Sequence, residues 1–185
     1  MKNKTFIVSA AAFAVMGLLS GCSLLSPDVK KVNYYDLSFS GKEKFKVNCR
    51  FETRNFHNIS PARLNLLFTS NNSVIELDQY NYWVQSPETM LRRFFLNAIE
   101  TTDTPASRVL DASLTIFEFK FDLIRKEAVL GINLVLRDKE RNIKKEKNYI
   151  IKNAVAKSER PDFVNAMNKC TEQFINQAVN DIKKI

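Results

Sequence analysis

Hydrophobic residues occupy every second position over much of the chain beyond residue 32, which is the pattern of half-buried β-strands. The alternation is clearest in three segments, Phe45 to Phe51, Leu110 to Ile116 and Ala128 to Leu136. Shorter runs predict further strands at 32–37, 64–69, 74–77 and 148–154. The hydrophobic phase shifts at Phe117, Phe119 and Phe121, and this shift predicts a β-bulge.

Two segments have the spacing of amphipathic helices instead. Ser86-Pro87-Glu88 is a typical helix start, with a capping residue, a proline in the first turn and an acid near the positive end of the helix dipole. The apolar positions that follow it are Met90, Leu91, Phe94, Phe95, Ala98 and Ile99. Pro161 opens a second helix, whose apolar face holds Phe163, Ala166, Met167, Cys170, Phe174, Ala178 and Ile182.

The segments between these elements are polar. Residues 70–73 predict a hairpin turn, residues 55–63 a longer connection, and residues 138–147 a charged hairpin tip. The order of strands, helix, strands and helix, with a long meander from 109 to 154, predicts a single α+β domain. We expect a mostly antiparallel sheet with two amphipathic helices packed on one face.

The first 21 residues have the features of a secretory signal peptide. Lys2 and Lys4 precede an apolar stretch from Phe6 to Leu19, which is shorter than the roughly 20 residues of a membrane-spanning helix. Leu19-Ser20-Gly21-Cys22 resembles the bacterial lipobox, in which the cysteine is acylated and the chain is cut before it. We therefore predict a lipoprotein signal peptide at 1–21, a lipidated tether at 22–31 and one domain at 32–185.

The predicted lipid site, Cys22, is followed by Ser23 and not by aspartate. Aspartate at that position retains lipoproteins in the inner membrane in enterobacteria-like sorting, so Ser23 favours the outer membrane, with the domain facing the periplasm. Because a single acyl chain binds a bilayer only marginally, two or three chains are needed for stable anchoring. The tether from Ser23 to Lys31 could extend about 30 Å.

Composition excludes several classes of function. The chain has four glycines, and none cluster beyond residue 21, so a glycine-rich phosphate-binding loop is excluded. The single histidine, His57, excludes multi-histidine metal sites. It lies in a predicted loop without a nucleophilic partner, and no catalytic residues, cofactor or metal are predicted. The net charge is +8, or +6 without Lys2 and Lys4. A positive charge can favour nucleic acid as a partner, but the predicted signal peptide disfavours it here.

Several residues are candidates for contacts or bonds. Five aromatic residues are candidate partner-binding residues: Tyr34, Tyr35, Tyr80, Tyr82 and Trp83. For Trp83 the alternative is a structural role between the sheet and the following helix, and Tyr34 and Tyr35 must point to opposite faces of their strand. The basic residues of the 138–147 tip could contact anionic lipid or an acidic partner, or simply be solvated.

Cys49 and Cys170 both lie on apolar faces, of a strand and a helix respectively. Two interpretations stay open at this point. In an oxidising periplasm the two thiols could form a disulfide, provided that the geometry allows it. Otherwise they are two buried free thiols.

The order of these features resembles a known family. A lipobox, Tyr34-Tyr35-Asp36-Leu37 after a tether, Trp83 shortly before a proline-initiated helix, a long β-meander and a closing helix are similar to the ABC-type transport auxiliary lipoprotein component family, which is PqiC/YmbA-like. The resemblance covers about residues 34–182. Its most specific parts are the Tyr-Tyr-x-Leu run and the segment from Tyr80 to Leu91.

The resemblance implies a function in lipid transport. Members of this family are lipid-anchored, non-enzymatic partners of MCE-domain proteins and ABC transporters, which move phospholipids or other hydrophobic molecules between two membranes. The implied partner is an MCE-domain protein, and a homo-oligomer would suit a ring-shaped partner. Two alternatives remain: a carrier that shields a lipid in an apolar cavity, and a structural envelope lipoprotein.

Overall fold

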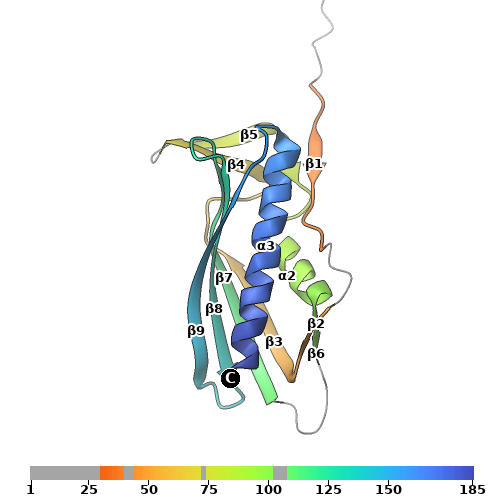
Figure 1. Ribbon diagram of the computed structural model, residues 1–185, viewed down its shortest axis with the longest axis vertical. Coiled ribbons are helices and arrows are strands. Elements are labelled where there is room, and N and C mark those ends of the chain that lie inside the picture. The colour runs from red at the N-terminus through yellow and green to blue at the C-terminus, as the bar shows by residue number, and fades with distance from the viewer. Residues whose placement is uncertain (1–29, 40–43, 72–73, 102–107) are drawn as a thin grey trace, which may run out of the picture. The chain divides into compact units, whose positions relative to one another are not determined.

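The computed structural model describes residues 30–39, 44–71, 74–101 and 108–185 (Figure 1). The domain from Val32 to Ile185 forms one compact unit. Its strands are β1 (Asn33–Tyr35), β2 (Phe45–Val47), β3 (Cys49–Asn58), β4 (Asn65–Asn71), β5 (Val74–Trp83), β6 (Ile99–Thr101), β7 (Arg108–Asp122), β8 (Glu127–Asp138) and β9 (Ile143–Ala154). Its helices are α2 (Pro87–Ala98) and α3 (Arg160–Lys183). The predicted signal peptide, Cys22 and most of the tether lie outside the described residues.

The fold is α+β with a mixed, mostly antiparallel sheet, which confirms the predicted class. The main sheet has seven strands in the order β1-β5-β4-β7-β8-β9, and β3 also pairs with β7. The long β7-β8-β9 meander is antiparallel throughout. Its register shifts between Ile116 and Glu118, so the β-bulge predicted from the change of hydrophobic phase is present.

The parallel pairings were not predicted. β3 and β4 lie one after the other along the same edge of β7, and both run parallel to it. β3 continues to Asn58, so the prediction that the connection begins at Asn55 is wrong. The strand predicted from Phe45 to Phe51 is interrupted at Asn48. Its first part, β2, pairs with β6 in a separate two-stranded sheet. The charged tip is shorter than predicted because β9 already begins at Ile143.

α2 begins at the predicted Pro87, and α3 begins at Arg160, one residue before the predicted Pro161. Pro87 and Pro161 occupy the first turns of α2 and α3, where a missing backbone N–H costs no hydrogen bond. α3 packs along β8 and β9, whereas α2 packs mainly on β3. Among the described residues, no helix is both long and apolar enough to cross a membrane.

Aromatic rings fill much of the core between these elements. Phe163 of α3 meets Phe68 of β4 and Phe121 of β7, with ring centroids 5.4 Å apart in both pairs. Phe95 of α2 contacts Phe51 and Phe56 of β3 edge to face. Such contacts add to the apolar area that each ring buries.

Candidate interaction surface

The two aromatic segments singled out in the sequence are neighbouring strands. β1 pairs in parallel with the end of β5, so that Tyr34 lies opposite Tyr82 and Tyr35 opposite Trp83. The rings of Tyr34 and Tyr82 lie 5.9 Å apart. Tyr34 is 67% exposed, whereas Tyr35 packs against the core. The prediction that Tyr34 and Tyr35 point to opposite faces is therefore confirmed.

Trp83 lies in the core. Its side chain is 1% exposed and its ring packs against Phe119 at 5.3 Å and Phe121 at 6.1 Å. A folded domain cannot offer this side chain to a partner, so Trp83 is removed from the candidate contact residues and keeps its structural role. Tyr35 is half-buried and packs against the core. The predicted contact surface then consists of Tyr34, Tyr80 and Tyr82.

A polar network fastens β1 to the rest of the domain. The buried Asn81 side chain accepts hydrogen bonds from Asn33 Nδ2 at 3.0 Å and from the Tyr35 hydroxyl at 3.3 Å. Asn81 Nδ2 in turn donates to Asp78 Oδ1 at 2.9 Å. Asp78 Oδ2 accepts from Arg160 Nε at 2.7 Å. One chain of contacts thus joins β1, β5 and the first turn of α3.

The charge of Asp78 is stabilised within this network. Burial by itself raises the pKa of Asp78, but hydrogen bonds from the Tyr80 N–H, the Asn81 side chain and Arg160 outweigh burial and hold the pKa below its usual value. The Arg160 guanidinium also lies over the Phe68 ring, 4.2 Å from its centroid. Arg160 therefore links the start of α3 to both β4 and β5.

We expect Arg160→Gln to lower the free energy of unfolding by about 1–3 kcal/mol, because Asp78 would stay buried without its charged partner. Urea denaturation followed by circular dichroism measures this loss. Lys157→Gln is the matched control, since Lys157 is exposed in the connection just before α3. Equal effects of the two substitutions would contradict the role assigned to Arg160.

The Tyr-Tyr-x-Leu run also contacts α2. Asp36 forms an ion pair with Arg93, and Leu37 is buried in the core. Both charged side chains are about 40% exposed, so the pair adds little stability by itself. Its effect is to position the chain between β1 and α2.

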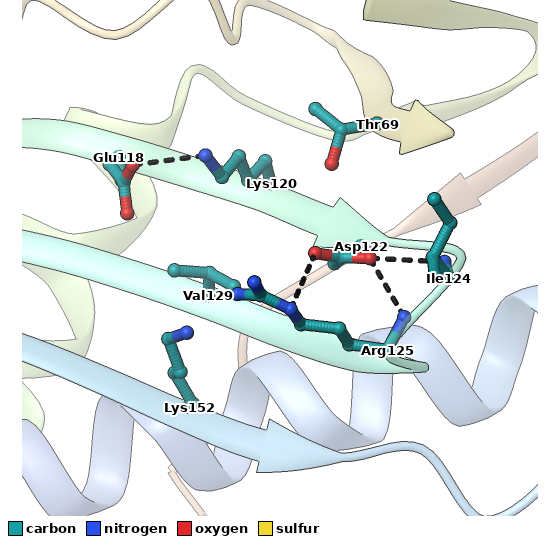
Figure 2. Close-up of a pocket in the computed structure, with 8 residues that line it drawn as sticks. All are labelled: Thr69, Glu118, Lys120, Asp122, Ile124, Arg125, Val129 and Lys152. Atoms are coloured by element: carbon teal, nitrogen blue, oxygen red, sulfur yellow. Dashed lines mark hydrogen bonds and ion pairs between the residues drawn. The ribbon is translucent and has the colours of Figure 1, made fainter. Parts of the chain in front are cut away.

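The described residues form an open, charged pocket on the sheet (Figure 2). It has a volume of about 330 Å³ and is lined by Thr69, Glu118, Lys120, Asp122, Ile124, Arg125, Val129 and Lys152. Lys120 pairs with Glu118 at 2.9 Å, and Asp122 accepts hydrogen bonds from the backbone N–H groups of Ile124 and Arg125 (Figure 2). Cavities for lipids are lined mainly by apolar side chains, so this pocket does not suit a lipid tail.

Two further pockets also have charged linings. One, of about 360 Å³, includes Asp111, Arg137 and Arg141 in its lining. The other, of about 210 Å³, includes Asp78 and Arg160, which form an ion pair with each other. The pockets described here thus give no support to the carrier alternative.

Cys49 and Cys170 are both buried free thiols, so the disulfide considered from the sequence is not formed. Cys49 pairs with Arg108 at the start of β7, whereas Cys170 contacts Ala128, whose strand partner is Phe121. Arg108 and Phe121 stand thirteen positions apart in one strand, which corresponds to about 40 Å. A disulfide requires Cα atoms within about 7 Å.

We expect neither thiol to react in the native Ser23–Ile185 protein. Burial raises the pKa of Cys170 to about 11 and also raises the pKa of Cys49, and the thiolate is the reactive form. Titration with Ellman's reagent at pH 8 should show no fast reaction in buffer and two thiols in guanidinium chloride. Rapid reaction of one thiol in the native protein would contradict this burial.

The described part of the chain shows no candidate metal centre. Within residues 30–39, 44–71, 74–101 and 108–185, no group of three or more His, Cys, Asp or Glu side chains is arranged to hold a metal ion. His57 is exposed on β3, in register with Thr115 of β7. It is a strand residue and not the loop residue that was predicted.

Two solved structures share the fold of this domain. The crystal structure of an uncharacterized protein matches with a TM-score of 0.67 at 12% sequence identity, covering 83% of this chain and 99% of its own. The crystal structure of a Xanthomonas campestris protein of the family DUF330 matches with a TM-score of 0.64 at 10% identity, covering 80% of this chain and 92% of its own. No protein-family model and no curated protein matches the sequence.

Proposed function

We propose that this protein is an outer-membrane-anchored periplasmic lipoprotein, an auxiliary subunit of an MCE/ABC-type system for lipid transport between membranes. The observation that carries the proposal is the pairing of β1 with β5. The two segments on which the family resemblance depends, Tyr34–Leu37 and the region of Trp83, form one structural unit. Because the two segments pair with each other, a lipoprotein of this kind would need both of them to form this part of the domain.

The proposed anchor is the acylated thiol of Cys22. It would leave the domain attached to the bilayer through residues 23–31, which reach the domain at Val32. β1 begins directly afterwards, and the network around Asn81 and Asp78 holds it in the sheet. A force applied to the tether would therefore act on β1, which is fixed in the sheet.

An interaction role is better supported than a carrier role. The rings of the core contact one another at 5.2–6.2 Å, and the pockets described above are open and charged. A carrier needs an enclosed apolar space of the size of an acyl chain. The candidate contact residues are Tyr34, Tyr80 and Tyr82, of which Tyr34 and Tyr80 are exposed.

The proposal includes the arrangement of the helices. We infer that α2 and α3 cover the same face of the sheet, because core rings of both helices, such as Phe94 and Phe174, belong to one continuous cluster and the two helices contact each other. The opposite face of β7, β8 and β9 would then stay open to solvent or to a partner.

Two measurements test the function. Labelled palmitate should enter the full-length protein, and Cys22→Ala should release it from the membrane fraction. The soluble Ser23–Ile185 protein should bind the MCE-domain protein encoded beside it. Failure of labelling would remove the anchor. Absence of binding, or native mass spectrometry that shows a co-purified phospholipid inside the domain, would remove the role of docking subunit.

A further inference from the structure

The positive charge of the protein is concentrated at one end of the domain. The segments 44–54, 99–101, 108–111, 137–147 and 181–185 hold thirteen Lys and Arg against seven Asp and Glu. Outside them, the chain from Cys22 onward has thirteen of each sign. These segments therefore account for the whole net charge of +6 that remains after removal of the signal peptide.

Strand pairing and helix contacts bring these segments together. Cys49 of β3 lies opposite Arg108 of β7, and Asp111 of β7 opposite Arg137 of β8. Asp181, near the end of α3, forms ion pairs with Lys145 and Lys147 of β9. Figure 1 shows the C-terminus beside the tip of the β8–β9 hairpin. We call this region the distal basic end.

The distal basic end lies far from the point where the tether enters. α3 begins at the Arg160–Asp78 contact, next to the strands β5 and β1, and it ends at Lys183. Its 24 residues span about 36 Å. Figure 1 shows β1 and the distal basic end at opposite ends of α3.

Part of the negative charge at this end is already engaged by lysines. Asp138 pairs with Lys144 at 2.9 Å, and Asp181 pairs with Lys147 at 2.8 Å. Glu52, Glu100, Glu140 and Glu146 remain as exposed acids. Exposed basic side chains outnumber them, among them Arg108, Lys139, Arg141, Lys183 and Lys184. The field at this end is positive, and it would attract an acidic surface and orient its approach.

We propose that the distal basic end is the docking surface for an acidic region of a periplasmic protein partner. This inference rests on the proposed function for its orientation, because an anchor at Cys22 puts the opposite end of α3 farthest from the attachment point. An MCE-domain protein that arrives from the other membrane would meet this end first. Lipid headgroups of the anchoring membrane are closer to the tether entry, so they are the less favoured occupant.

Photocrosslinking in cells tests the surface with the full-length lipoprotein. A photoreactive amino acid is introduced at Lys139 or Lys184, and as matched controls at Lys126 or Lys157, which are exposed near the start of α3. Adducts are identified by mass spectrometry, including the crosslinked peptide of the partner. We expect protein adducts at the two distal positions, with a partner peptide rich in Asp and Glu, and at most weak adducts at the controls.

A charge reversal gives the second measurement. Lys139→Glu combined with Lys184→Glu should reduce the association rate with the crosslinked protein by about tenfold at low salt. Lys126→Glu combined with Lys157→Glu changes the net charge equally and should leave the rate nearly unchanged. The association rate of the wild-type protein should also fall as the salt concentration rises. This measurement does not require the charge-reversed variant to fold.

The outcomes separate this inference from the proposed function. An acidic partner crosslinked at the distal end supports the inference, and the proposed function survives only if that partner contains an MCE domain. Binding of an MCE-domain protein that is unaffected by the distal reversal, or crosslinks mainly at the control positions, overturns the inference alone. Lipid adducts at the distal end, or no adducts there, overturn it as well.

Discussion

Replacing Trp83 with alanine should lower the free energy of unfolding of the soluble Ser23–Ile185 protein by about 3–5 kcal/mol. The side chain is 1% exposed and packs on Phe119 and Phe121. Its removal would leave a cavity between the end of β5 and β7 that neighbouring rings fill only in part. Small domains are stable by about 5–15 kcal/mol, so the variant should unfold at much lower urea concentrations.

Tyr34→Ala is the matched control for this substitution. Tyr34 comes from the neighbouring strand but is 67% exposed, so its removal should cost no more than about 0.5 kcal/mol. Circular dichroism follows both variants. In the wild type, the single tryptophan should also emit as a buried indole until the domain unfolds. A stable Trp83→Ala protein that has lost partner binding would reverse the assignment and make Trp83 a contact residue.

The elements predicted correctly from the sequence are those whose pattern is local. Alternation in β7 and β8 arises because one face of each strand packs on the core. The phase shift at Phe117 marks an inserted residue, and it can be recognised from the sequence of β7 alone. The start of α2 at Pro87 likewise depends on three adjacent residues. Such signals need no knowledge of what lies across the sheet.

The end of β3 was missed because its residues look like a connection. Asn55 and His57 are exposed, and Phe56 between them is only partly buried. What extends the strand is its parallel pairing with β7, from Cys49 opposite Arg108 to Asn58 opposite Ile116. Parallel neighbours are distant in sequence, so no local pattern indicates them.

The same limit applies to the candidate surface. The sequence identified Tyr34 and Tyr82 as separate features, but not that their rings lie side by side. The contact between Asp78 and Arg160 joins residues that are 82 positions apart. Neither residue type is unusual in its own segment. Only the folded chain shows that the network under the tyrosines also holds the start of α3.

The second large effect concerns Asp181, whose carboxylate links the end of α3 to β9. Its Oδ2 accepts from the Tyr149 hydroxyl at 2.7 Å and from Lys147 Nζ at 2.8 Å, and its side chain is 9% exposed. Burial by itself raises the pKa of Asp181, but the hydrogen bonds from Lys147 and Tyr149 and the charge of Lys145 lower it from 3.8 to about 2. Burial, and then the contact with Asp181, raise the pKa of Tyr149.

These contacts make stability depend on pH with a defined sign. The folded pKa of Asp181 is below the unfolded value, so its contribution is fully present above about pH 4 and is lost as the pH falls through about 2. Asp181→Asn should therefore destabilise the protein by about 2 kcal/mol at pH 7, since hydrogen bonds to charged groups contribute about 1.5–3 kcal/mol. The same substitution should cost much less near pH 2, where the Asp181 carboxyl is about half protonated in the folded protein and almost fully protonated in the unfolded chain.

Urea denaturation of the wild type and of Asp181→Asn at pH 7, 5, 3 and 2 measures this difference directly. Other carboxyl groups titrate over the same range, but they are common to both proteins and cancel in the comparison. Glu146→Gln, at an exposed carboxylate of β9 beside Lys145 and Lys147, should change the unfolding free energy little at any of these pH values. A difference between wild type and Asp181→Asn that stays constant from pH 7 to 2 would show that shape, and not the charge of the carboxylate, holds α3 against β9.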